Sequence, residues 1–181
     1  MSLKRRFATL MGWEEPLTTI EAGHTAPDFS LKSLDGKEYS LAQLLEKGPV
    51  VAAFFKISCP VCQFTLPFIQ RLADRYSGDT ATILTISQDD AKSTVSFNKE
   101  YGLSLLTLLD DPKDYRVSNA YGLSMVPTIF LIEPGGKVKV SCMGFGKADL
   151  EQIADELSTR SRITAAPLFR ADEVIPASKP G

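Results

Sequence analysis

The chain has 181 residues and a net charge of −2, so it lacks the basic excess that a nucleic-acid partner would require. Apolar residues make up 44% and charged residues 23%, which is typical of a globular protein, and the length suits one domain with a substantial core. No apolar run approaches the roughly 20 residues of a membrane-spanning helix, so we also expect no membrane partner.

Residues 1–22 are predicted to be an N-terminal leader with weak periodicity. Lys4, Arg5 and Arg6 resemble the basic start of a signal peptide, but no apolar stretch of adequate length follows them. We therefore predict a cytoplasmic protein. In that compartment three cysteines indicate redox work or metal binding rather than a structural disulfide framework.

The next part of the chain, residues 23–160, is predicted to be one α/β domain. Alternating polar and apolar residues predict a short strand at 26–31, and the turn composition that follows predicts a hairpin with a second arm at 38–40. Further strands are predicted at 81–87, 128–132 and 137–143, and 105–109 is another short apolar run. Helices are predicted from Leu41 to an end at Gly48-Pro49, from Asp89 or Asp90 to 101, from Asp111 to 121, and over 150–157. These elements predict a mixed sheet with helices on both faces. Residues 161–181 are rich in Pro and Ala, and we predict a tail with little regular structure.

The stretch from Val50 to Tyr76 is the most informative. An apolar run of strand length leads into Cys59-Pro60-Val61-Cys62, and apolar residues then recur at helical spacing. Two cysteines three residues apart in a first helical turn can come within disulfide distance. A strand that ends at such a pair, where a helix begins, is typical of a thioredoxin-like redox motif.

The position of Cys59 predicts its role. The free N–H groups and the dipole at the start of a helix favour an anion, and the thiolate is the attacking species in thiol–disulfide exchange. We therefore assign Cys59 as the attacking thiol and Cys62 as the resolving thiol. Pro60 suits the first helical position, because the lack of an N–H has no cost there.

Several further motifs resemble the thioredoxin superfamily. They are the cysteine motif after a strand, Val126-Pro127-Thr128 at the start of a later strand, and Gly135-Gly136 in a hairpin before the last helix. Ala26-Pro27-Asp28-Phe29 and Leu34-Asp35-Gly36 resemble the start of two narrower groups, the TlpA/ResA-like thiol-disulfide oxidoreductases and the AhpC/TSA (peroxiredoxin-like) family. The resemblance implies a thioredoxin-like fold, with a central mixed sheet flanked by helices and an N-terminal β-hairpin extension.

The same resemblance implies residues that surround the active site. Pro127 would follow a cis peptide bond, and the backbone of Val126 would pair with the extended chain of a substrate. The predicted surroundings of the two cysteines are Pro60, Val61, Val126, Pro127, Lys56 and Ser58.

The sequence also departs from the family pattern. Ala53 and Thr65 stand where relatives often carry an acid that accepts the proton of the resolving thiol, and Ser58 replaces an aromatic residue before the first cysteine. Lys56 is the nearest ionisable residue on the strand, so it is a candidate for lowering the pKa of a thiol.

The sequence thus predicts an enzyme that exchanges disulfides in protein or small-molecule substrates, with a thioredoxin- or glutathione-type thiol as reductant and no cofactor. A proline directly after the first cysteine resembles glutaredoxin and DsbA, so we expect a reduction potential less negative than that of thioredoxin, about −270 mV. Two alternatives stay open: a thiol-dependent peroxidase that uses Cys59, and a redox-sensing binding module without turnover. The peroxidase loop Pro-x-x-x-Thr-x-x-Cys does not fit, because Ala52 and Lys56 occupy its positions before Cys59.

Two other residues could have carried chemistry. We interpret Cys142, in the last hairpin, as a small buried hydrophobic residue, with a third redox thiol as the alternative. His24 is the only histidine and is expected at the surface. Because no second paired-ligand motif is present, the sequence predicts no metal site.

Overall fold

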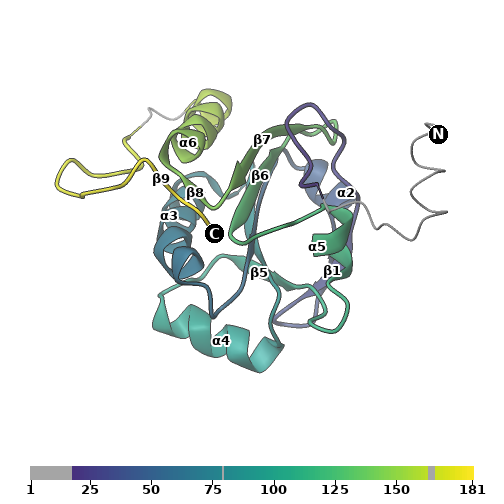
Figure 1. Cartoon of the computed structure of the whole chain (residues 1–181). Helices are drawn as coiled ribbons and strands as arrows, with labels where there is room; N and C mark the ends of the chain where they lie inside the picture. The colour runs from purple at the N-terminus through teal and green to yellow at the C-terminus, as the bar shows by residue number, and fades with distance from the viewer. Residues whose placement is uncertain (1–17, 79, 163–165) are drawn as a thin grey trace, which may run out of the picture.

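The architecture is a central mixed sheet with helices on both faces (Figure 1), seen in a computed structural model that describes residues 18–78, 80–162 and 166–181. The strands are β1 (Ser30–Ser33), β2 (Glu38–Ser40), β3 (Val50–Phe55), β4 (Thr82–Ser87), β5 (Leu106–Leu109), β6 (Thr128–Ile132), β7 (Val138–Met143), β8 (Phe145–Gly146) and β9 (Ser178–Lys179). The helices are α2 (Leu41–Leu45), α3 (Pro60–Tyr76), α4 (Ala91–Glu100), α5 (Arg116–Ala120) and α6 (Lys147–Ser161). The main sheet has the strand order β2-β1-β5-β4-β3-β6-β7, and β8 pairs separately with β9.

The strand β3 lies in the interior of the sheet and is buried along its whole length. It pairs in parallel with β4 and antiparallel with β6. Val51, Ala53 and Phe55 pack on the side of α3 and α6, whereas the alternate residues pack on the side of α2 and α5. Because both faces of the sheet are covered, this strand is a continuous apolar run rather than an alternating one.

The predicted N-terminal hairpin is confirmed, but its first arm is β1 at Ser30–Ser33 rather than the predicted 26–31. β1 and β2 pair antiparallel with Ser30 opposite Ser40, and β1 joins the main sheet through β5. The predicted mixed sheet with helices on both faces is confirmed as well. Residues 1–17 of the predicted leader lie outside the described residues. The cytoplasmic location, which was inferred from the sequence of that leader, stays a prediction. Within the described ranges, none of the helices is long and apolar enough to cross a membrane.

The helix predicted from Asp111 begins later than expected, and that boundary is wrong. The N–H of Tyr115 donates to the carbonyl of Asp111 at 2.8 Å and closes a turn, so that α5 starts only at Arg116. The buried carboxylate of Asp110 accepts the N–H groups of Val117 at 3.1 Å and Ser118 at 2.8 Å. The helix start is therefore set by an acid at the end of β5, several residues before the helix.

The segment 166–181 folds back onto the domain beside α3 and α6 (Figure 1). Its regular structure is the two-residue strand β9, which pairs antiparallel with β8. Leu168 and Phe169 are buried, and the ring of Phe169 lies 5.0 Å from that of Phe68 on α3. The Pro- and Ala-rich composition did not indicate that this segment contributes to the core.

The buried ring of Phe169 provides a test of this packing. We expect Phe169→Ala to lower the free energy of unfolding by about 3 kcal/mol, because a buried aromatic side chain is lost and a cavity remains. Val174→Ala, in the same segment at a side chain that is 98% exposed, is the matched control and should stay within about 0.5 kcal/mol. Urea unfolding of the two variants measures the difference, and equal stabilities would contradict the packing.

Candidate active site

Cys59 is the N-cap residue of α3, so it lies at the N-terminal end (the mouth) of this helix, and Pro60 occupies the first helical position as predicted. The N–H of Cys62 donates to the Cys59 Sγ at 3.2 Å. Cys59 is partly exposed, whereas Cys62, one turn further into the helix, is completely buried, and both are free thiols. The structure therefore places one accessible sulfur in front of a protected one.

The loop before β6 completes the surroundings of Cys59. Its thiol donates to the carbonyl oxygen of Val126 at 3.2 Å, across 67 residues of sequence. The Val126–Pro127 peptide bond is cis, as the resemblance implied. The carbonyl of Pro127 in turn accepts the N–H of Gly144 at 2.7 Å, which ties this loop to the turn between β7 and β8.

Two side chains hold the loop that leads from β3 to Cys59. The carboxylate of Asp89 accepts the N–H of Ile57 at 2.8 Å, and the amide of Gln63 donates to the carbonyl of Ile57 at 2.9 Å. The sequence offered Asp89 or Asp90 only as caps of α4. Since Asp90 is the N-cap and accepts the N–H of Ser93, Asp89 is left to position the active-site loop.

The other predicted surroundings are distributed around the helix mouth. Ser58 and Pro60 are exposed, and Val61 is half-buried against the core. The ammonium of Lys56 donates to the hydroxyl of Tyr115 at 3.3 Å and lies 5.6 Å from the centre of its ring. The side chain of Lys56 is thus directed toward the start of α5, and an effect of its ammonium on a thiol stays a prediction.

Comparison with known proteins agrees with this geometry. Residues 22–141 match the model of the AhpC/TSA family. The thiol-disulfide oxidoreductase ResA of Geobacillus thermodenitrificans is 34% identical over 142 residues, which cover 77% of this chain and 80% of the relative. The chain belongs to the AhpC/TSA family. ResA of Bacillus subtilis, also a thiol-disulfide oxidoreductase, is 33% identical over 121 residues, and both relatives agree with the activity that the sequence motifs indicated.

Solved structures of similar proteins show the same fold. A putative thiol:disulfide interchange protein DsbE from Chlorobium tepidum superposes with a TM-score of 0.67 at 23% identity, over 79% of this chain and 99% of that one. A putative thioredoxin from Neisseria meningitidis gives a TM-score of 0.64 at 30% identity, over 77% of this chain and 91% of that one. The predicted thioredoxin-like fold is confirmed.

Burial opposes ionisation of the Cys62 thiol. Loss of solvation raises the pKa of the Cys62 thiol far above its ordinary value, and the neighbouring Cys59 and the charge of Asp89 add to the rise. The backbone N–H of Lys56 opposes the rise but does not cancel it. Ala53 and Thr65 are buried, and the Thr65 hydroxyl donates to the carbonyl of Val61 at 2.6 Å. Neither position therefore supplies a carboxylate to accept the proton of Cys62.

The two other residues weighed from the sequence are Cys142 and His24. Cys142 is 1% exposed, and burial raises the pKa of its thiol to about 12, which confirms the interpretation as a buried hydrophobic residue. His24 is exposed, and its ring contacts the carbonyl of Glu21. In the part of the chain that the structure describes, no group of three or more metal-ligating side chains comes together.

The different environments of the three cysteines predict different reactivity. We expect iodoacetamide at neutral pH to modify Cys59 in the folded protein while Cys62 and Cys142 stay unmodified, because burial excludes the reagent and keeps both thiols protonated. Mass spectrometry of the digested protein measures the modified sites. The same reaction in urea is the control and should label all three; faster labelling of Cys62 than of Cys59 in the native protein would contradict the arrangement.

Proposed function

We propose that this protein is a thiol-disulfide oxidoreductase in which Cys59 attacks the substrate disulfide and Cys62 completes the exchange. The observation that carries the proposal is the placement of the Cys59 Sγ at the helix mouth, 3.2 Å from both the Cys62 nitrogen and the Val126 oxygen. The backbone N–H of Cys62 supports the negative charge that the attacking sulfur must carry. The ResA relatives support the same chemistry.

The reaction follows from the order of the two thiols. The thiolate of Cys59 attacks one sulfur of the substrate disulfide, forms a mixed disulfide and releases the first substrate thiolate, which takes up a proton. Cys62 then gives up its proton and attacks the sulfur of Cys59, which releases the second substrate thiolate. Two electrons pass to the substrate, and the protein keeps a Cys59–Cys62 disulfide.

The proposed partners are a protein or small-molecule disulfide and an external thiol reductant of the thioredoxin or glutathione type. The reductant returns the Cys59–Cys62 disulfide to two thiols by the same exchange in reverse. Because the two sulfurs carry both electrons, the proposed cycle uses no further cofactor. The direction of net transfer depends on the potential of the partner pair.

Substitution of each cysteine by serine tests the assigned roles. We expect Cys59→Ser to abolish the reduction of insulin disulfides, and Cys62→Ser to accumulate a mixed disulfide with the substrate, because the resolving thiol is missing. Cys142→Ser, at the buried third cysteine, is the matched control and should keep the activity. Full activity of Cys59→Ser would refute the assignment, and peroxide consumption without insulin reduction would favour the peroxidase.

The dipeptide between the cysteines predicts the potential of the pair. With Pro60 directly after Cys59, we expect a reduction potential less negative than about −270 mV, the value of thioredoxin. Equilibration of the protein with glutathione buffers of graded composition, followed by trapping of the thiols, measures the potential. A more negative value would contradict this expectation without affecting the roles of the two cysteines.

A further inference from the structure

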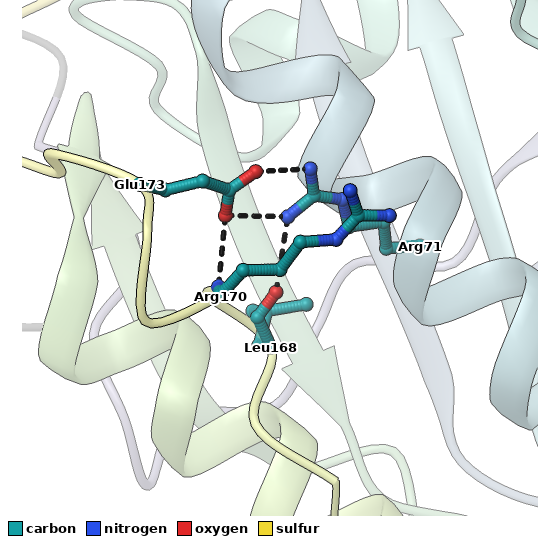
Figure 2. A network of polar contacts seen from close by, with 4 residues as sticks. All are labelled: Arg71, Leu168, Arg170 and Glu173. Atoms are coloured by element: carbon teal, nitrogen blue, oxygen red, sulfur yellow. Dashed lines mark hydrogen bonds and ion pairs between the residues drawn. The ribbon is translucent and has the colours of Figure 1, made fainter.

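The segment 166–181 is held on the domain by a network of polar contacts on α3 (Figure 2). The guanidinium of Arg71 forms a bidentate ion pair with Glu173 and donates to the carbonyl of Leu168 at 3.3 Å. The carboxylate of Glu173 also accepts the N–H of Arg170 at 2.9 Å. Arg71 holds the pKa of Glu173 at about 2, so the pair stays charged at neutral pH.

Beyond this network the segment runs alongside β8. The carbonyl of Ala177 accepts the N–H of Lys147 at 2.9 Å, and Lys179 pairs opposite Phe145 in the β8–β9 ladder. The ammonium of Lys179 lies 4.9 Å from the ring centre of Phe64, on the first half of α3. The segment thus approaches the helix that begins at Cys59.

Its last residues reach the loop that contacts the reactive sulfur. A Cβ atom on Gly181 would lie 2.4 Å from the carbonyl oxygen of Val126, which is the oxygen that accepts the thiol of Cys59. A Cβ atom on Gly144 would likewise lie 2.3 Å from the carbonyl oxygen of Lys179. One side of the approach to Cys59 is therefore occupied by the protein's own backbone.

The other side of the active-site loop is open. A groove of about 630 Å³ begins at Ile57, Ser58 and Gln63 and continues along α4. A small disulfide needs room only for a few atoms around the sulfur of Cys59. A polypeptide disulfide carries chain in two directions from its cysteine, and a chain that ran along Val126 would meet the backbone at Gly181, which lies against the Val126 carbonyl.

We propose that residues 176–181 are a specificity-determining segment, which covers the Val126 side of Cys59 and limits exchange with polypeptide disulfides more than with small ones. The inference rests on the proposed function of Cys59. The Arg71–Glu173 pair holds the chain just before residues 176–181, and the short β8–β9 ladder is the part that must open. A polypeptide substrate then binds only to the fraction of molecules in which the ladder is open, which lowers its apparent affinity.

Removal of residues 176–181 tests the inference, since it leaves the buried Leu168 and Phe169 and the Arg71–Glu173 pair intact. We expect kcat/KM for insulin disulfides to rise about tenfold, and kcat/KM for hydroxyethyl disulfide to change less than about twofold. Val174→Ala is the control, because its exposed side chain lies just before residues 176–181 and the backbone contacts of those residues persist. An unchanged or lower value for insulin, in an enzyme active on both disulfides, overturns the inference and leaves the proposed function standing.

A second measurement does not depend on turnover. We expect the shortened chain to react with polyethylene-glycol maleimide at Cys59 faster than the full chain does, while both react equally with iodoacetamide. Equal rates with the polymer reagent overturn the coverage of Cys59. Absence of exchange with both disulfides, in the full and the shortened chain, overturns the proposed function and the specificity role that rests on it.

Discussion

The contact between the Cys59 sulfur and the Val126 carbonyl depends on the arrangement of the whole sheet. The two residues are 67 apart in sequence, and they meet because β3 ends just before Cys59 while β6 begins just after Pro127. β3 and β6 are hydrogen-bonded neighbours, with Phe54 opposite Thr128 at the end nearest the site. A shift of this register by one residue would move the helix mouth away from the loop and turn the buried side chains of β3 to the wrong faces.

The same geometry gives the two cysteines opposite environments. Cys59 is the N-cap residue, and its sulfur lies over the end of the helix, where it accepts the N–H of Cys62. Cys62 itself is packed in the core between the helix and the sheet. Cys59 is therefore reachable and Cys62 is buried. The cost is that Cys62 must lose its proton where solvation is poor and the nearby charge of Asp89 is negative. Burial thus opposes the second step of the exchange, in which Cys62 must lose its proton before it can attack the mixed disulfide.

Local signals made a large part of the site predictable. The cysteine pair after an apolar strand, the proline at the first helical position and the buried Cys142 follow from neighbouring residues, and the structure agrees with each. Contacts between distant residues were not predictable in this way. The bond from Asp89 to Ile57 and the Arg71–Glu173 pair join residues 32 and 102 apart. A single acidic or basic residue in the sequence does not indicate which residue it contacts. Many opposite charges lie at the surface, and most exposed ion pairs stabilise the fold only weakly.

The turn at Gly144 shows how closely the domain and its C-terminal segment fit each other. Its φ of +73° favours glycine on conformational grounds alone, since a Cβ atom in the left-handed region is strained. Asn or Asp tolerate that region better than other residues and would suffice for the turn. Here the space for a Cβ at position 144 is taken by the backbone of Lys179 and Gly181. Neither Asn nor Asp would therefore fit at this position while residues 178–181 lie against the domain. The glycine thus serves two demands at once, the turn that leads β7 into β8 and the close approach of residues 178–181 to the loop beside Cys59.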